Sequence, residues 1–338
     1  MKKSIFLGAL TVAGLVAGAA SATTLEDVKA RGTLNCGVNT GLVGFAAPDA
    51  NNNWQGFDID YCRAVASAVL GDADAINYVP LTGKTRFTAL AAGEIDVLSR
   101  NTTWTFSRDN DLKFEFVGVN YYDGQGFIVP KELGVTSARD LDGATVCIQT
   151  GTTTELNLAD FFRSNDMSYE PVPIETNAEA LQQYTAGACD VYTTDASGLA
   201  ASRATFETPG DHVILPEIVS KEPLGPLVRH GDNEWGDIAR WVLNALISAE
   251  ELGITSANVA ELAGGTDNPE INRMLGTEGG LGEMIGLDAD WAARAIASVG
   301  NYGEIFERHI GENTPIGLAR GLNAQYTDGG LMYSPPFR

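Results

Sequence analysis

The pattern of apolar and polar positions repeats itself once along the chain. Gly32–Asn39 and Gly143–Thr150 are each a short strand pattern that starts at a glycine and follows a polar helical segment. Ala92–Val97 and Ala186–Val191 form a second matching pair, in which an apolar helix ends near a glycine and leads into a buried strand. Two such pairs in the same order predict an α/β protein of two lobes, each a mostly parallel sheet flanked by helices.

The pattern within each half predicts strands that alternate with helices. In the first half we expect strands at 33–39, 75–79 and 95–99 and helices at 58–70 and 85–92. In the second half we expect strands at 145–149, 169–173 and 189–194 and helices at 153–163 and 177–186. The apolar face of the first long helix is formed by Ile59, Cys62, Val65, Ala66 and Val69.

The repeat stops after about residue 200. Residues 219–228 contain Pro223 and Pro226 and are typical of an extended connection rather than a helix. In the last part of the chain the pattern predicts a helix at 288–298. The sequence leaves two roles open for the chain after about residue 250, which either braces the first lobe or contacts a partner.

The N-terminal residues 1–22 are typical of a secretory signal peptide. Lys2 and Lys3 form a basic start, the apolar run Ile5–Ala20 follows, and Ala20 to Ala22 give a small-residue cleavage site. The alternative is a membrane anchor, for which the apolar run is short and rich in glycine and alanine. We therefore expect a mature chain that begins at Thr23 in the periplasm.

Charge narrows the classes of partner. The chain has 44 acidic residues against 22 Lys and Arg, and its formal net charge is −22. This acidity argues against nucleic acid and against anionic membrane surfaces as partners. It does not exclude an anionic ligand, because binding depends on the local field of a cleft.

The four cysteines are expected to form two disulfides in an oxidising compartment. No CxxC pair is present and the histidines lie far from the cysteines in sequence, so zinc is disfavoured. Cys62 is on the sheet-facing side of a predicted helix next to the strand of Cys36, and Cys147 and Cys189 are both on central strands. The predicted bridges are Cys36–Cys62 and Cys147–Cys189, one in each lobe.

Polar residues gather where three of the predicted strands end. They are the segments Ser99–Trp104, Gln149–Glu155 and Thr193–Asp195. Because ligands bind beyond the carboxyl ends of strands in open α/β sheets, we expect these loops to line one cleft. The repeat places Asn101 and Asp195 at equivalent sites in the two lobes.

These loops have the groups that a zwitterion needs. Thr152 and Glu155 form a capping-box pattern at a predicted helix start. The free N–H groups there would hold a carboxylate. The alternative is an ordinary helix cap that binds no ligand. Arg108 can pair with the same carboxylate and Asp195 with an ammonium group, which together suggest an α-amino acid. Taken singly, each is equally typical of a surface ion pair.

Other residues have two interpretations each. Arg86 either contacts the side chain of the ligand or is a solvated residue at a helix start. Phe45 and Trp54 either cover an apolar stem or belong to the core. Asp96 and Asp190 recur at the strand entries of the repeat, so we interpret them as structural.

Six motifs resemble a known family. Gly56–Asp60, the pattern from Arg86 to Val97 and Gly151–Thr153 resemble the polar amino-acid-binding proteins of bacterial ABC importers, over roughly residues 30–245. The closing part is similar to the general L-amino-acid-binding subfamily, which includes binders of glutamate, glutamine, aspartate and asparagine. That similarity is carried by Gly300–Phe306, Arg320–Asn323 and Gly329–Phe337.

The resemblance implies a two-lobe periplasmic binding protein fold of type II with a two-strand hinge. The hinge crossings are expected near 124–129 and 219–225. Lobe 1 would comprise residues 23–126 and 222–338, and lobe 2 residues 127–221.

The resemblance also implies roles for individual residues. Arg108 would clamp the ligand carboxylate near Asn101 and Thr103, with Thr153 contributed by lobe 2. Asp195 would bind the ammonium group, and Arg86 and, less directly, Asn177 would contact the ligand side chain. In this sequence Asn101 stands where Ser or Gly is more usual and Gly83 where some relatives have Ser, which puts the side-chain selectivity in question.

The implied mechanism is hinged closure of a monomer around an L-amino acid, followed by delivery to the permease subunits of an importer. No cofactor, metal ion or nucleic acid is expected. One rival is an enzyme on the same fold, such as a small dehydratase or a lytic transglycosylase, which needs a general acid or base in the cleft. The loops contain Asp195 and Glu155 but no histidine. A second rival is the sensing module of a receptor.

Overall fold

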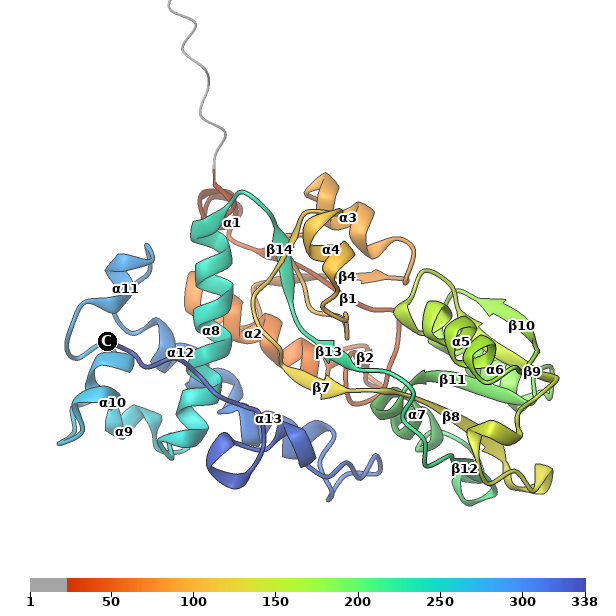
Figure 1. Ribbon diagram of the computed structural model, residues 1–338. Helices are drawn as coiled ribbons and strands as arrows, with labels where there is room; N and C mark the ends of the chain where they lie inside the picture. Colours follow the sequence, from red (N-terminus) through yellow and green to blue (C-terminus); the bar gives the residue numbers. More distant parts are fainter. Residues whose placement is uncertain (1–22) are drawn as a thin grey trace, which may run out of the picture.

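The computed structural model describes residues 23–338, and the predicted signal peptide at 1–22 lies outside them. Two five-stranded sheets form the centres of two lobes (Figure 1). The larger lobe contains the sheet ordered β4-β1-β5-β14-β6, and the smaller lobe the sheet ordered β10-β9-β11-β8-β12. No helix within 23–338 combines the length and the apolar character needed to cross a bilayer.

The repeat seen in the sequence is the central part of each sheet. In the larger lobe β1 lies between β4 and β5 and is parallel to both, and in the smaller lobe β9 lies in the same way between β10 and β11. The predicted two-lobe α/β fold is therefore confirmed. The strands of the larger sheet are β1 (Leu34–Asn39), β4 (Ile76–Leu81), β5 (Val97–Leu98), β6 (Phe114–Phe116) and β14 (Leu227–Arg229). Those of the smaller sheet are β8 (Gln125–Pro130), β9 (Ala144–Gln149), β10 (Tyr169–Ile174), β11 (Val191–Asp195) and β12 (His212–Ile214).

Helices cover the sheets, and those of the repeat begin and end within one or two residues of the predicted positions. In the larger lobe they are α1 (Thr24–Arg31), α2 (Phe57–Leu70), α3 (Arg86–Ala92), α4 (Phe106–Asn110) and α8 (Asn233–Glu251). In the smaller lobe they are α5 (Thr153–Ser164), α6 (Asn177–Thr185) and α7 (Ala196–Arg203). Short 3-10 turns span Lys131–Leu133, Ala138–Asp140, Pro209–Asp211, Gly321–Asn323 and Tyr326–Asp328.

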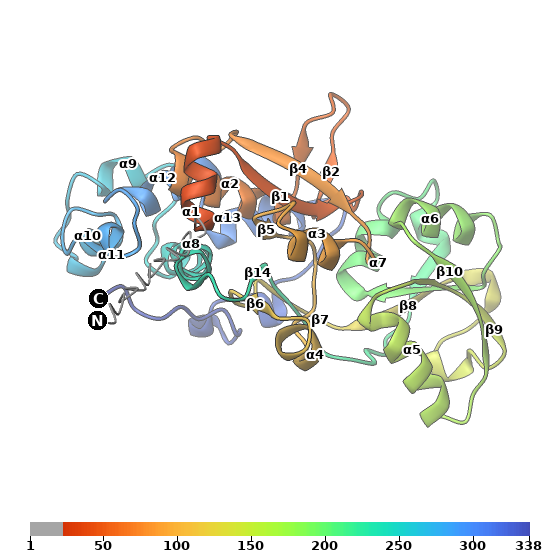
Figure 2. The ribbon, with the colours of Figure 1, turned by 90° about the horizontal axis from the view of Figure 1, so that it is seen from above.

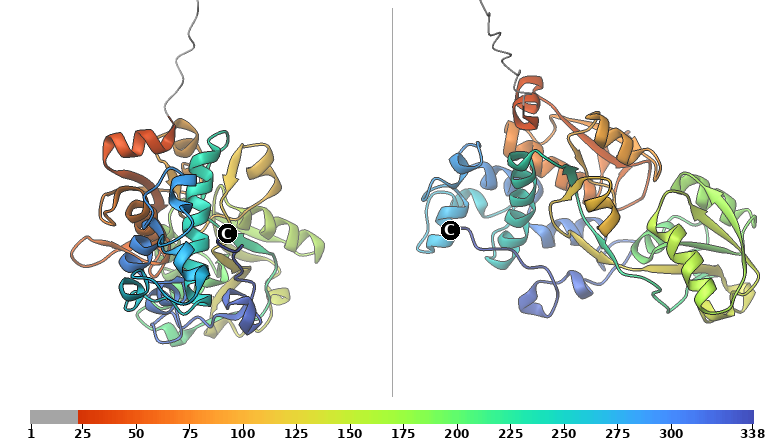
Figure 3. Two further views of the ribbon diagram at one scale, coloured as in Figure 1. Left: turned by 90° about the vertical axis from the view of Figure 1, so that its left-hand side faces the viewer. Right: turned by 45° about the horizontal axis from the view of Figure 1, so that its top comes forward.

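The last part of the chain packs against the larger lobe. Its helices are α9 (Val259–Leu262), α10 (Pro269–Met274), α11 (Leu281–Met284), α12 (Trp291–Val299) and α13 (Tyr302–His309). Seen from above, α9, α10 and α11 lie on the side of the larger lobe that faces away from the smaller lobe (Figure 2). The end of the chain then returns toward α8 (Figure 3). There the ring of Phe337 packs 5.0 Å from that of Trp241.

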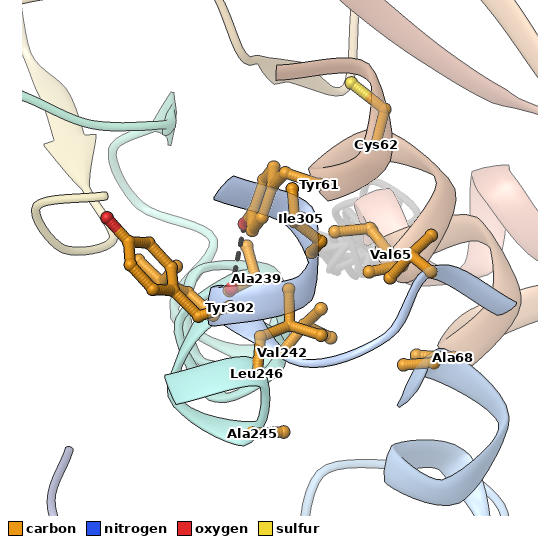
Figure 4. Close-up of a cluster of buried hydrophobic side chains, with 14 of the residues drawn as sticks. Tyr61, Cys62, Val65, Ala68, Ala239, Val242, Ala245, Leu246, Tyr302 and Ile305 are labelled. Atoms are coloured by element: carbon orange, nitrogen blue, oxygen red, sulfur yellow. Dashed lines mark hydrogen bonds between the residues drawn. The ribbon is translucent and has the colours of Figure 1, made fainter. Parts of the chain in front are cut away.

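The core of the larger lobe shows why this extension folds there. Val65 of α2, Val242 of α8 and Ile305 of α13 pack together in one buried cluster (Figure 4). The hydroxyl of Tyr61 donates a hydrogen bond of 2.8 Å to the carbonyl of Ala239 inside this cluster, so its polar end is satisfied. Each such aliphatic side chain contributes about 1.5–3 kcal/mol when it is fully buried. The extension therefore completes the core of the larger lobe. Of the two roles that the sequence left open, the structure supports bracing of this lobe.

Each lobe contains one disulfide bond. The structure joins Cys36 of β1 to Cys62 of α2 and Cys147 of β9 to Cys189, with Cα–Cα distances of 6.3 and 5.6 Å. These are the predicted pairs, and each lies within one lobe.

The repeated aspartates are structural, as the sequence indicated. Asp96 accepts a hydrogen bond of 2.7 Å from the backbone N–H of Asn35, and Asp190 accepts one of 2.9 Å from that of Thr145. Each carboxylate thus ties the entry of one strand to the neighbouring strand of its sheet.

Two short strands connect the lobes side by side. β7 (Tyr121–Asp123) and β13 (Glu222–Leu224) form an antiparallel pair, in which Asp123 is opposite Glu222. β7 continues through Gly124 into β8, and β13 precedes β14 (Figure 1). A separate small hairpin of the larger lobe consists of β2 (Ala47–Pro48) and β3 (Trp54–Gln55).

Candidate ligand-binding cleft

The polar ends of β5 and β11 and the start of α5 meet between the two lobes. Asn101 donates through Nδ2 to Oδ2 of Asp195 at 3.4 Å, and the hydroxyls of Thr103 and Thr153 lie 3.1 Å apart. Both contacts join the larger lobe to the smaller one. The structure therefore brings together four of the residues that the sequence proposed for a ligand site.

Backbone geometry explains why Asn101 reaches across. Its φ of 24° lies in the left-handed region, which asparagine tolerates better than most residues. Its N–H donates to Oδ2 of Asp58 at 3.1 Å, and its side-chain oxygen accepts from Asn39 at 3.0 Å. The amide group is thereby held with its nitrogen toward Asp195.

Arg86 lies buried at the start of α3. Its side chain is 2% exposed, and its two terminal nitrogens donate to the hydroxyl of Thr102 at 3.1 Å and to the carbonyl of Gly151 in the other lobe at 3.5 Å. The Nε of Arg86 is buried without a hydrogen-bond partner. The interpretation of Arg86 as a solvated helix-start residue is therefore wrong.

Arg108 lies in α4 and is also buried. Its Nη1 donates to the carbonyl of Thr103 at 2.8 Å. The ring of Phe87 lies under both guanidinium groups, 5.1 Å from Cζ of Arg108 and 4.8 Å from that of Arg86. An aromatic face stabilises cations at this distance, so Phe87 holds both groups in place without neutralising them.

A third guanidinium group, that of Arg100, was not selected from the sequence. It is buried, and its Nε donates to the carbonyl of Leu81 at 2.9 Å. The signal was present, because Arg100 stands in the polar segment directly after β5. What the sequence did not reveal is that the side chain turns inward.

These three cations affect one another. Burial is the largest cause that lowers the pKa of each group, to about 10 for Arg100 and Arg108 and well below its ordinary value for Arg86. The positive charges of Arg100 and Arg108 lower the pKa of Arg86 further. The cleft thus concentrates positive charge that an anion would stabilise.

Carboxylates collect at the other side of the cleft. Burial raises the pKa of Asp195 well above its usual range, and the neighbouring Asp123 and Glu222 raise it further. Burial also raises the pKa of Asp123 to about 6. A cation placed among these groups would favour their ionised forms.

The start of α5 is capped as predicted, with one difference. The hydroxyl of Thr152 accepts a hydrogen bond of 3.2 Å from the N–H of Glu155, whose carboxylate accepts from Gly151 at 2.9 Å rather than from Thr152. Thr153 is the first residue of the helix. The first N–H groups of a helix have no partner within it, so this end can receive a carboxylate.

Asn177 and Phe45 lie away from this centre. Asn177 donates to the carbonyl of Gly41 in the other lobe at 3.2 Å and accepts from the hydroxyl of Tyr192 at 3.1 Å. Phe45 is buried with its ring 5.8 Å from that of Tyr121 and 6.1 Å from that of Phe57. This is the packing of a core residue, and a role for Phe45 over the ligand stays a prediction.

The lobes also touch away from this centre, at a more exposed place. Lys84 and Glu175 form an ion pair of 2.8 Å there. A Cβ atom on Gly83 would lie 2.7 Å from the carbonyl oxygen of Thr150, closer than real Cβ contacts come. Glycine in place of the serine found in some relatives therefore permits this close approach, and the structure describes a closed arrangement.

The chain is similar to known binding proteins along its whole length. It is 68% identical to the glutamate/glutamine/aspartate/asparagine-binding protein BztA of Rhodobacter capsulatus and 58% identical to the general L-amino acid-binding periplasmic protein AapJ of Rhizobium johnstonii, in each case over 100% of both chains. A periplasmic binding protein of Brucella ovis, solved with glutathione bound, is 56% identical and superposes with a TM-score of 0.91 over 94% of this chain and 100% of that one. Residues 34–257 match the family described as bacterial extracellular solute-binding proteins, family 3. With this match and these identities, the chain belongs to the family 3 bacterial extracellular solute-binding proteins.

Proposed function

We propose that this chain is an exported, periplasmic binding protein that captures an L-amino acid between its lobes and delivers it to the permease of an ABC importer. The name of the Rhodobacter capsulatus relative supports amino acids with acidic or amide side chains, and that of the Rhizobium johnstonii relative supports a broader range of L-amino acids. We place the lobe boundaries at 23–126 plus 222–338 and at 127–221. The protein binds and releases its ligand without changing it chemically, and it acts as a monomer.

The observation that carries this proposal is the state of the three buried arginines. Within residues 23–338, no carboxylate oxygen lies within 4.0 Å of the guanidinium nitrogens of Arg86, Arg100 or Arg108. Burying a cation without an anionic partner is costly, so the partner is expected to arrive with the ligand. Three such groups suit a ligand with more than one acceptor group.

The ligand would lie with its ends at the two charged sides. Arg108 and the first turn of α5 would hold the α-carboxylate, and Asp195 the ammonium group. Arg86 and Arg100 would hold the side-chain carboxylate or amide. Every charge of the ligand then finds a partner away from water.

The test is calorimetry on residues 23–338, unfolded and refolded with the disulfides intact to remove any ligand that co-purifies. Glutamate, glutamine, aspartate and asparagine are titrated separately, with lysine as the comparison. We expect tight binding of the acidic and amide ligands and none of lysine, whose ammonium would face the arginines. Absence of binding by all four would contradict the proposal.

The Brucella ovis structure supports glutathione as a second candidate ligand. Its γ-glutamyl end presents the same α-carboxylate and ammonium groups as glutamate. The remaining two residues would extend toward the exposed contact of Lys84 with Glu175 between the lobes. Glutathione is therefore expected to bind to a more open form, with a larger radius of gyration in X-ray scattering than the glutamate complex.

A further inference from the structure

Glu222 is a buried acidic residue between the lobes that neither the sequence motifs nor the site above assigned to a role. It is 1% exposed and lies at the start of β13. Its carboxylate accepts hydrogen bonds from four side chains. They are the hydroxyl of Thr103, the hydroxyl of Thr153 at 2.8 Å, Nδ2 of Asn157 at 2.6 Å and the hydroxyl of Ser220 at 2.6 Å.

These donors come from both sides of the cleft. Thr103 belongs to the larger lobe, whereas Thr153 and Asn157 are on α5 of the smaller lobe. β13 is tied to the larger lobe, because Thr103 pairs with Leu224 and the N–H of Trp104 donates to the carbonyl of Pro223 at 2.8 Å. When the lobes separate, Glu222 therefore stays with the larger lobe and loses Thr153 and Asn157.

The hydroxyl protons of Thr103 and Thr153 are both taken up by hydrogen bonds among these two residues and Glu222. Each hydroxyl has one proton, Thr103 and Thr153 lie 3.1 Å apart, and both contact Oε2 of Glu222. Whether both donate to the carboxylate or one donates to the other, no hydroxyl proton remains for a ligand. In this arrangement the two hydroxyls can only accept hydrogen bonds from the ligand, and its carboxylate depends on Arg108 and the start of α5.

We propose that Glu222 is a closure latch, a carboxylate on the hinge strand that holds α5 of the smaller lobe against the larger lobe before a ligand is bound. This inference rests on the proposed function, because closure serves ligand capture. Hydrogen bonds to a carboxylate are among the stronger ones in proteins, and those from Thr153 and Asn157 exist only in the closed form. The latch therefore raises the fraction of closed protein, and it raises affinity because less of the binding free energy is spent on closing.

The main test compares ligand-free protein in solution by small-angle X-ray scattering. We expect Glu222→Gln to have a larger radius of gyration than the wild type without ligand and the same radius with saturating glutamate. Its affinity for glutamate should fall about tenfold, as expected when one strong hydrogen-bonded group is weakened. Equal ligand-free radii together with equal affinities would overturn the proposal.

Two further variants separate a latch from a merely structural role. Glu222→Gln combined with Asn157→Asp exchanges donor and acceptor across the contact, and it should restore the compact ligand-free form. Glu217→Gln is the matched control, since Glu217 accepts from Ser137 and from the N–H of Ala138 within the smaller lobe alone. It should leave the radius and the affinity unchanged.

If Glu222→Gln does not fold, as judged by circular dichroism, Asn157→Ala removes one donor from the smaller lobe and leaves the hinge strand intact. It should open the ligand-free protein in the same direction, and an unchanged radius for it would overturn the latch. The ligand-free scattering does not depend on which ligand binds. Failure of the wild type to bind amino acids would therefore contradict the proposed function and leave the measurement of the latch valid.

Discussion

Asn101 and Asp195 occupy equivalent positions in the two halves of the repeat, and in the closed structure they touch, with Nδ2 of Asn101 3.4 Å from Oδ2 of Asp195. A serine at position 101 would be too short to span this gap from the same backbone. The asparagine at position 101, where the resemblance implied Ser or Gly, thus adds a contact between the lobes. This hydrogen bond lowers the pKa of Asp195, whereas burial raises it and has the larger effect.

We predict that Arg108→Ala weakens amino-acid binding by roughly 3 kcal/mol, because it leaves the ligand carboxylate in the cleft without its charged partner. Calorimetry measures the change. Arg163→Ala is a suitable control, because Arg163 is an exposed residue of α5 that forms an ion pair with the exposed Asp160 of the same helix. Near-normal affinity of Arg108→Ala would refute its role.

Arg86 and Arg100 are expected to control selectivity among side chains. Replacing either with alanine should reduce the affinity for glutamate more than that for glutamine, since an anionic side chain depends more on a cation than an amide does. We expect the ratio of the two affinities to change by about tenfold or more. The assignment fails for whichever variant keeps the wild-type ratio, measured by parallel titrations with the two ligands.

Amino-acid binding should release protons near neutral pH. The pKa values of Asp195 and Asp123 are raised in the cleft, the latter to about 6, and the ammonium group of a ligand favours their ionised forms. Affinity should therefore fall as the pH drops from 7 to 5, because protons compete with the ammonium group.

Titration in buffers with different ionisation heats measures this release. We expect the apparent binding enthalpy to differ between phosphate and Tris, and the difference to shrink in Asp123→Asn. Identical enthalpies in the two buffers would mean that binding releases no protons.

Asp58 should make the folded protein less stable as the pH rises. Its carboxyl is buried in α2, and burial raises its pKa from 3.8 to about 6. Because the folded-state value is above the unfolded one, the favourable contribution is complete below about pH 4 and is lost as the pH rises through 6.

The size of this effect is about 3 kcal/mol for a difference of roughly two pKa units. Unfolding in guanidinium chloride at pH 4 and pH 7 should show a smaller loss of stability for Asp58→Asn than for the wild type. The asparagine keeps an oxygen that can accept from the N–H of Asn101. Parallel pH dependence of the two proteins would contradict the assignment.

The local pattern of the sequence predicted the elements that surround each half of the site. β9 and α5 follow the predicted ranges closely, and the bridges Cys36–Cys62 and Cys147–Cys189 form as expected. These features depend on periodicity and on neighbours within one lobe. Helix 288–298 was predicted with less success, since α12 spans Trp291–Val299, and the long helix α8 was not identified at all.

The residues that sequence reasoning missed share one property. Arg100 and Glu222 are charged and buried and Asp123 is charged and half-buried, whereas charged residues in polar or extended segments are usually exposed. Glu222 in particular lies between Lys221 and Pro223, where nothing in the pattern indicates burial. Three of the four side chains that donate to it lie more than 60 residues away in the chain.

The sequence by itself determined two similar α/β lobes, their internal bridges and a set of polar residues at the ends of their strands, because alternation and helical spacing are properties of neighbouring residues. The tertiary structure alone decided that Asn101 meets Asp195, that three arginines lie together with no carboxylate of residues 23–338 within 4.0 Å of them, and that Glu222 joins the lobes. The physical reason is that these contacts join residues from different elements of the fold. The arginines meet through the packing inside the larger lobe, and the contacts of Asn101 and Glu222 depend on how one lobe is placed on the other, for which the two hinge strands leave no periodic signal in the chain.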